Sequence, residues 1–202
     1  MPVFVNEAGR RVFYAHVPKT GGTYVEDLFR RNGYSVHFWE SRPRSLSLVC
    51  SPQHFHRPLY EAIFRMGEFD LAFMTVRSPL ERMLSEYRNQ CASRPQGMKD
   101  WLVKIGRALE RDGSAFDNHL RPQVDFFHPG LAVHRQEDGF DADWAQRLSA
   151  EHDLGFSVFE VPRRRNTSAT PSPLAPADRA LSAAHCAKAY AQDYAFFGYD
   201  DA

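Results

Sequence analysis

The segment at residues 18–23, reading PKTGGT, contains the residue types that bind a phosphate or sulfate group. A glycine pair between a buried strand and a helix lets backbone N–H groups turn toward an anion, and the start of the helix adds partial positive charge. Lys19 supplies a full positive charge, and Thr20 and Thr23 supply hydroxyl donors. These residues predict an anion cradle; the alternative is a tight strand-to-helix turn with an incidental surface lysine.

Arg77, at the end of a second buried segment, and Ser85, two helical turns further on, predict a second phosphate site. The carboxyl ends of parallel strands gather at one edge of a sheet, which would bring Arg77 beside the glycine turn. The pattern differs from a Walker-type ATPase, because Lys19 precedes the glycines and Arg77 stands where a Walker B strand carries an Asp for Mg²⁺. The alternative is an ordinary surface arginine that pairs with Glu81.

Strand and helix patterns alternate along the chain, which predicts an α/β fold with a mostly parallel central sheet. Ser78 as N-cap, Pro79 at the first helical position and Glu81 predict a capping box at the start of one helix. Residues 116–127 and 162–176 are expected to be irregular. The predicted strands are at 11–17, 34–39, 70–77 and 131–134. One predicted helix ends at Gly33 and another starts at Pro79. The other predicted helices are at about 53–66, 98–111, 141–152 and 177–194.

Length and composition limit the function. With 202 residues, of which 43% are hydrophobic, the chain is expected to form one domain over residues 1–202. Lys plus Arg equals Asp plus Glu, 25 against 25, so a whole-surface attraction to nucleic acid or membrane is excluded and any anion site must be local. No apolar run reaches the roughly 18 residues of a membrane span, and no secretory signal is visible. Three scattered cysteines fit free thiols in a reducing, cytoplasmic location.

Two of these segments together resemble a known family. Residues 14–23, reading YAHVPKTGGT, resemble the 5′-phosphosulfate-binding loop of sulfotransferases, and residues 76–87, reading VRSPLERMLSEY, resemble their 3′-phosphate-binding segment. Their order and separation are similar to the branch that contains the Golgi carbohydrate sulfotransferases, such as heparan sulfate 2-O-sulfotransferase, and soluble bacterial relatives. The resemblance extends over residues 11–92 and 116–199.

This resemblance implies a single sulfotransferase domain with a P-loop-like, three-layer α/β/α fold. The sulfuryl donor would be 3′-phosphoadenosine 5′-phosphosulfate (PAPS), which leaves as 3′,5′-adenosine bisphosphate (PAP). The implied cofactor-binding residues are Lys19, Thr20, Gly21, Gly22, Thr23 and Tyr24 toward the 5′-phosphosulfate, Arg77 and Ser85 toward the 3′-phosphate, and Arg165, Asn166 and Ser168 in a loop that closes over the nucleotide.

Sulfuryl transfer to an alcohol needs a base for the hydroxyl proton, and a neutral imidazole suits that task. The carbohydrate branch carries a His-x-His whose second histidine is the base, so the resemblance favours His56, with His54 assisting. The spacer Phe55 and the following residues leave the choice between the two histidines open. The alternative is that one of them only caps or packs near a helix start. No other His or Cys lies at ligand spacing on this segment, so no metal is expected.

The segment at 118–123, reading NHLRPQ, is expected to bind the acceptor through His119, Arg121 and Gln123, unless it is a loop tied down by its own side chains. The resemblance implies a hydroxyl-bearing acceptor, with a carbohydrate or glycolipid expected. Three arginines at 163–165 invite a nucleic-acid interpretation, but the neutral overall charge favours a nucleotide lid.

Two other functions stay open at this point. One is a P-loop kinase or NTPase, which Mg²⁺-dependent turnover of ATP or GTP would reveal. The other is a non-catalytic nucleotide-binding module, which would bind PAP tightly and transfer nothing. The oligomeric state and the sulfated position cannot be derived from these residues.

Overall fold

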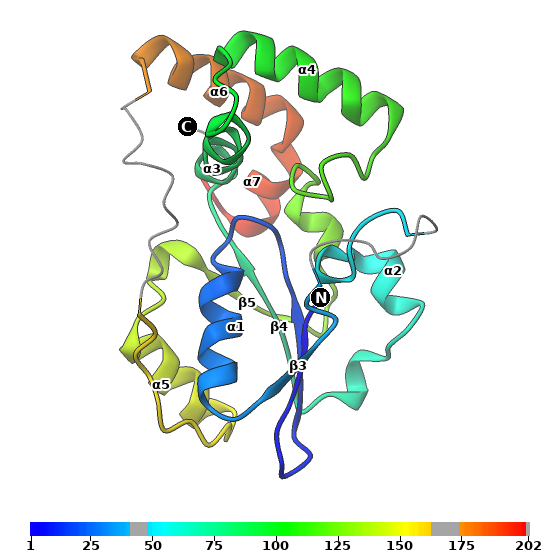
Figure 1. The fold of residues 1–202 in the computed structure, drawn as a ribbon, viewed down its shortest axis with the longest axis vertical. Coiled ribbons are helices and arrows are strands. Elements are labelled where there is room, and N and C mark those ends of the chain that lie inside the picture. Colours follow the sequence, from blue (N-terminus) through cyan, green and yellow to red (C-terminus); the bar gives the residue numbers. More distant parts are fainter. Residues whose placement is uncertain (41–47, 163–173, 201–202) are drawn as a thin grey trace.

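The computed structural model describes residues 1–40, 48–162 and 174–200 (Figure 1). One sheet contains the strands β1 (Val3–Val5), β2 (Arg11–Ala15), β3 (Ser35–His37), β4 (Leu71–Val76) and β5 (Ala132–Arg135). The α-helices of the described residues are α1 (Gly22–Arg31), α2 (Arg57–Glu61), α3 (Pro79–Cys91), α4 (Met98–Arg111), α5 (Ala142–Glu151), α6 (Pro176–Ala189) and α7 (Ala191–Phe197).

The sheet is mixed, with the strand order β3-β1-β2-β4-β5. β2, β4 and β5 are parallel neighbours, as predicted. β1 was not predicted, and it runs antiparallel to both β2 and β3. A short turn at residues 6–10 joins β1 to β2, and a connection of that length can only join antiparallel strands. The parallel pair β2 and β4 places the two chain segments that follow these strands at one edge of the sheet.

Helices cover both faces of this sheet. Side chains alternate along β2, so Tyr14 packs on the face that α1 and α5 cover, and Phe13 packs on the face that α2 covers. Both side chains are fully buried, which agrees with an apolar strand enclosed on two sides. The expected α/β architecture is therefore present, with α1 and α5 on one side of the sheet in Figure 1.

A third apolar cluster lies beyond the carboxyl ends of the parallel strands. The chain passes from β4 into α3, which packs with α4 and α6 around Leu84, Trp101 and Cys186. Figure 1 shows α3, α4, α6 and α7 together at the top of the molecule, above the end of the sheet. Residues that follow β2 and β4 therefore lie between the sheet and this helical cluster.

Two predicted helices are wrong in extent. Residues 53–66 form a 3₁₀ turn at Pro52–His54, the short α2, and a second 3₁₀ turn at Met66–Glu68. Pro58 lacks a backbone N–H and so belongs in the first turn of a helix, which prevents a helix from running through it. The helix predicted at 177–194 is interrupted at Tyr190, whose hydroxyl donates to the carbonyl of Leu120.

The predicted capping box at the start of α3 is also wrong. Pro79 does begin the helix, but the Ser78 side chain makes no capping hydrogen bond. Glu81 instead pairs with Arg179 of α6 at 2.8 Å, and the Ser78 N–H donates to Glu137 at 2.7 Å. Tertiary partners therefore replace the local ones that the pattern predicts.

Candidate active site

The loop between β2 and α1 has an unusual backbone. Lys19 has a φ of 70° and Gly21 a φ of 95°, both in the left-handed region. At Gly22, an added Cβ would lie 2.2 Å from His16 Nε2, so only glycine lets the imidazole pack beneath the first turn of the helix. The loop conformation thus depends on a buried histidine as well as on the glycines.

The hydroxyl groups of this loop have different surroundings. Thr20 is fully buried, and its hydroxyl donates to the Val17 carbonyl at 2.8 Å. Thr20 also pairs with Thr75 of β4, whose hydroxyl in turn pairs with Tyr14. Thr23 is exposed at the start of α1. The Thr20 side chain therefore anchors the loop to the sheet, while Thr23 is accessible to a ligand.

Lys19 and Arg77 lie together at the carboxyl edge of the sheet. An Arg77 guanidinium N–H donates to the Lys19 carbonyl at 3.5 Å, across 58 residues of sequence. The Arg77 guanidinium also lies 4.0 Å from the Glu81 carboxylate, which is the pair expected if Arg77 were an ordinary surface arginine. Gln123, which is fully buried, fixes the backbone of Arg77 by accepting from its N–H at 2.9 Å and donating to its carbonyl at 2.8 Å.

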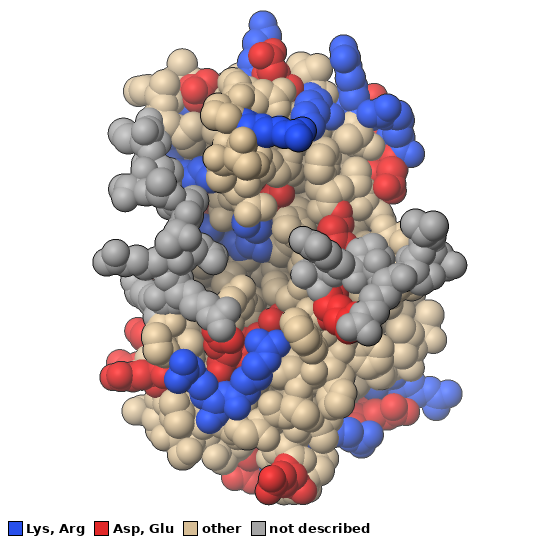
Figure 2. All heavy atoms as spheres, in the orientation of Figure 1, with Lys and Arg blue, Asp and Glu red and all other residues tan. Residues whose placement is uncertain are grey.

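A third cation stands near this pair. Arg88, on α3, has a buried Nε with no hydrogen-bond partner among the described residues, and its charge acts on Arg77. Ser85 is half-buried on the same helix. Figure 2 shows Lys and Arg side chains within the hollow at the middle of one face. Lys19, Arg77 and Arg88 thus give this edge of the sheet local positive charge, although the chain as a whole is neutral.

A strained turn at residues 116–118 forms another side of the site, which we call the opposite wall and which also includes His54 and His119. Phe116, Asp117 and Asn118 are consecutive residues with φ of 59°, 56° and 61°. Left-handed backbone costs roughly 1–2 kcal/mol for a residue with a side chain, and such strain collects at functional sites. The turn directs the Asp117 carboxylate to the Ser51 hydroxyl at 2.7 Å and to His54 Nδ1 at 2.8 Å.

Three histidines form a row, and each is bonded through Nδ1 to a carboxylate. The pairs are His16 with Glu26, His54 with Asp117, and His119 with Glu86, each at 2.8 Å. The His54 ring lies edge-on between the other two, with centroid distances of 5.2 Å to His16 and 4.9 Å to His119. Because a carboxylate accepts from an Nδ1–H, this pattern leaves Nε2 as the basic nitrogen of each neutral ring.

Burial determines the protonation state of His54. Removal from water lowers its pKa from the ordinary 6.5 to about 3, although Asp117 acts in the opposite direction. Burial likewise lowers the pKa of His16, with Glu26 opposing. Both rings are therefore neutral near pH 7.

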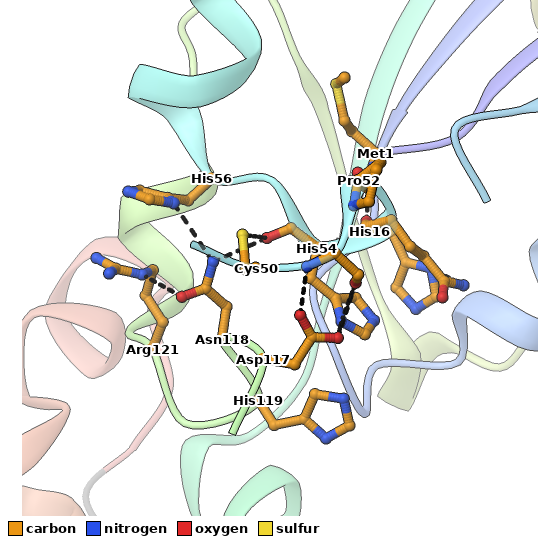
Figure 3. A network of polar contacts seen from close by, with 12 residues as sticks. Met1, His16, Cys50, Pro52, His54, His56, Asp117, Asn118, His119 and Arg121 are labelled. Carbon is orange, nitrogen blue, oxygen red and sulfur yellow. Dashed lines mark hydrogen bonds and ion pairs between the residues drawn. The ribbon is translucent and has the colours of Figure 1, made fainter. Parts of the chain in front are cut away.

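His56 stands apart from this row. Its Nδ1 lies 3.4 Å from the Asn118 amide nitrogen, and its ring is 6.4 Å from that of Phe126. Figure 3 shows it beyond Asn118, on the opposite side from His54. The nearby Arg121 donates to Asn118, Asp125 and the Gly113 carbonyl. The structure thus brings His54 next to His119, which shares the carboxylate of Glu86 with Lys19, and separates His56 and Arg121 from them.

One group of described residues has the composition of a metal site. His54, Asp117 and His119 each offer a ligand atom within 4.8 Å of the others. However, both Asp117 oxygens are already used, one by the Ser51 N–H and the other by the Ser51 hydroxyl and His54. These hydrogen bonds satisfy the carboxylate as the chain stands, and a metal ion would compete with Ser51 and His54 for its oxygens.

Sequence reasoning missed Glu26, Glu86, Arg88 and Asp117. A usable signal existed for Glu86, because it follows Arg82 by four residues, which places the two opposite charges on one face of a helix with apolar neighbours. In the structure both residues are 2% exposed. Tyr24 is half-buried, with its ring 6.0 Å from that of Phe140. Arg165, Asn166 and Ser168 lie outside the described residues.

The loop after β2 and the arginine after the parallel strand β4 meet at one edge of the sheet, as the strand pattern predicted. A family model described as "Sulfotransferase family" matches residues 2–200. The chain belongs to the sulfotransferase family. Comparisons with curated proteins and with solved structures found no match. Within the described residues, no helix of this sulfotransferase has both the length and the apolar composition needed to cross a membrane.

Proposed function

We propose that this sulfotransferase moves a sulfuryl group from PAPS to an acceptor hydroxyl by in-line transfer. The observation that supports this most directly is the contact between Arg77 and the Lys19 carbonyl. It joins the two segments that resemble the 5′-phosphosulfate and 3′-phosphate sites into one location. Such a donor carries both groups on one adenosine, so a single molecule would engage both segments.

Different residues would bind different groups of the donor. The backbone N–H groups of Gly21, Gly22 and Thr23 lie at the N-terminus of α1, where the helix dipole favours an anion. Lys19 would neutralise the oxygen between phosphorus and sulfur, and Arg77 with Ser85 would hold the 3′-phosphate. Arg88, with its buried and unpartnered Nε, adds charge on the same side as Arg77. Tyr24 borders the loop with an aromatic face.

The chemistry consists of one displacement at sulfur. The acceptor oxygen forms a bond to sulfur, the bond from sulfur to the phosphate oxygen breaks, and its electron pair stays on that oxygen beside Lys19. The acceptor proton passes to an imidazole. Of the two histidines in the His-x-His, the geometry favours His54 over His56, because only His54 packs against His119, whose carboxylate partner Glu86 also contacts Lys19.

The acceptor is proposed from the resemblance to the carbohydrate branch alone. A carbohydrate hydroxyl, free or on a glycolipid, fits a site lined by imidazole and carboxylate groups. Contacts from Arg121 and Gln123 are less suited to that role, because both side chains already make the hydrogen bonds described above.

The test is a thermal-shift panel of PAP against ATP, GTP and NAD, with and without Mg²⁺. At about 100 times its Kd, a bound ligand adds roughly 2.7 kcal/mol to the unfolding free energy, so PAP alone should raise the Tm clearly. Release of PAP from PAPS in the presence of oligosaccharide and glycolipid acceptors then tests transfer. Stabilisation by ATP with Mg²⁺, but not by PAP, would favour a kinase. PAP binding without transfer to any acceptor would favour a binding module.

A further inference from the structure

Glu86 occupies a position that the proposed chemistry has not yet used. It lies on α3 and is 2% exposed, so a carboxylate is held there almost without water. One oxygen, Oε2, lies 2.8 Å from His119 Nδ1 and 3.7 Å from Lys19 Nζ. The other oxygen accepts from Gln90 at 2.8 Å. A single buried oxygen therefore contacts both the lysine of the anion loop and a histidine of the opposite wall.

We infer that His119 is the proton acceptor of the transfer reaction and that Glu86 is a positioning residue that couples His119 to Lys19. This inference rests on the proposed function, since it assigns roles within that reaction. It moves the base from the His-x-His to a histidine of the segment at 118–123. It also assigns a role to a carboxylate that neither phosphate site requires.

Access favours His119 over His54. The His119 side chain is 23% exposed, whereas that of His54 is 6% exposed and enclosed by Asp117 and the two other rings. A base must reach the acceptor hydroxyl within about 3 Å, so the more open imidazole is better placed. In addition, burial lowers the pKa of His54 to about 3, and a group that weakly basic accepts a proton poorly.

Glu86 sets the His119 tautomer. Burial alone would raise the pKa of this carboxyl group, but hydrogen bonds from His119 and Gln90 and the charge of Lys19 outweigh burial and lower it. The ionised carboxylate accepts the Nδ1–H, which leaves the Nε2 lone pair for the incoming proton. The imidazolium that results remains paired with the carboxylate.

The shared oxygen links the two halves of the reaction. Before transfer, Glu86 holds Lys19 near the cradle. As the acceptor oxygen bonds to sulfur, its proton moves to His119 Nε2, and Glu86 then faces a full positive charge on His119. The pull of Glu86 on Lys19 weakens at the same moment that the bridging phosphate oxygen gains the electron pair of the broken bond to sulfur. Lys19 is thus freed toward that oxygen when its charge is needed.

The charged and titratable groups around His119 are few in the described structure. Glu86 of α3 contacts it and in turn contacts Lys19 of the anion loop, and the His54 ring, which is paired with Asp117, packs against it. Arg82 donates to its backbone carbonyl at 2.8 Å. His16 acts on it more distantly. Of these, only Glu86 contacts the His119 imidazole nitrogen with a negative charge.

The experiment measures PAPS turnover and PAP binding in Glu86→Gln, His119→Ala and His54→Ala, with His152→Ala, at the residue that follows α5, as the matched control. We expect His119→Ala to lose roughly 10²–10⁴-fold in kcat while its PAP-induced thermal shift is kept, and added imidazole to restore part of the rate. Glu86→Gln should lose roughly 10²–10⁴-fold in kcat while its PAP-induced thermal shift is kept, and Glu86→Asp, which keeps the carboxylate, should recover part of the rate.

Two results would overturn the inference. One is a near-normal rate in His119→Ala together with loss of turnover in His54→Ala, which would assign the base to His54. The other is a near-normal kcat in Glu86→Gln. If Glu86→Gln fails to fold, His119→Gln and imidazole rescue of His119→Ala still decide the point. Absence of PAP binding by the unmodified protein would instead refute the proposed function, independently of these variants.

Discussion

Replacing Gly22 with alanine tests the structure of the anion loop most directly. The new Cβ would lie 2.2 Å from His16 Nε2 and 2.4 Å from the adjacent ring carbon, well inside van der Waals contact. The ring cannot move freely, because its Nδ1 is bonded to the buried Glu26 at 2.8 Å. Either the helix start shifts or the His16–Glu26 bond breaks, and both outcomes disturb the loop.

The expected cost follows from these two effects. Overpacking a buried site costs about 1–3 kcal/mol, and leaving one buried partner of a hydrogen bond unsatisfied costs about 1–3 kcal/mol. We therefore expect Gly22→Ala to lose roughly 3 kcal/mol of unfolding free energy. For a chain of this size, about 2–4 °C of Tm accompany each kcal/mol, so the Tm should fall by about 6–12 °C.

Denaturant unfolding and calorimetry measure this loss, and two variants make the result specific. Gly106→Ala, inside α4 with nothing within 4 Å of its added Cβ, should gain about 0.5–1 kcal/mol. His16→Ala removes the ring, so Gly22→Ala should cost at least about 1 kcal/mol less in that background. Unchanged stability of Gly22→Ala, or equal cost in both backgrounds, would refute the packing of His16 beneath the loop.

Three further outcomes are expected. Lys19→Ala should lower the transfer rate by roughly 10²–10³-fold, whereas Arg77→Ala should mainly weaken PAP binding. Steady-state kinetics measures the first effect and isothermal titration the second, and the reverse pattern would exchange the roles of the two residues. Burial lowers the pKa of His54 from 6.5 to about 3 in the folded chain, so between these pH values only the unfolded chain binds a proton at this residue, and the unfolding free energy should fall as the pH drops from 6.5 toward 3. In urea titrations His54→Gln should show a shallower fall, and an equally steep one would contradict the burial of this ring. Dialysis against EDTA should leave PAPS turnover unchanged, because the Asp117 oxygens already accept hydrogen bonds, and loss of turnover restored by a divalent cation would oppose this.

Local patterns were sufficient for much of the fold. The apolar run before Pro18 and the one before Arg77 each predicted a strand, because β-branched and aromatic side chains pack on both faces of a sheet. The helix at 98–111 was predicted with the bounds that α4 has, since its apolar periodicity is strong and no proline interrupts it. β1 was missed because three residues are too few to show a period.

The positions of Lys19 and Arg77 were also predictable, because the alignment of parallel strands brings their carboxyl ends together whatever side chains they carry. The roles of the histidines were not. His54 and His56 are equivalent as sequence, yet the extended backbone of Phe55 sends one toward Asp117 and the other toward the side-chain amide of Asn118.

The primary structure alone determined where strands and helices form and which two segments meet at the sheet edge, since both depend on apolar periodicity and on strand direction. Only the folded chain decided the polar partners of the site. His54 meets Asp117 across 63 residues, and His119 meets Glu86 across 33. A buried charge is stable wherever the fold places an opposite charge or a hydrogen bond within reach. No spacing along the chain encodes that distance, so these pairs could be found only in three dimensions.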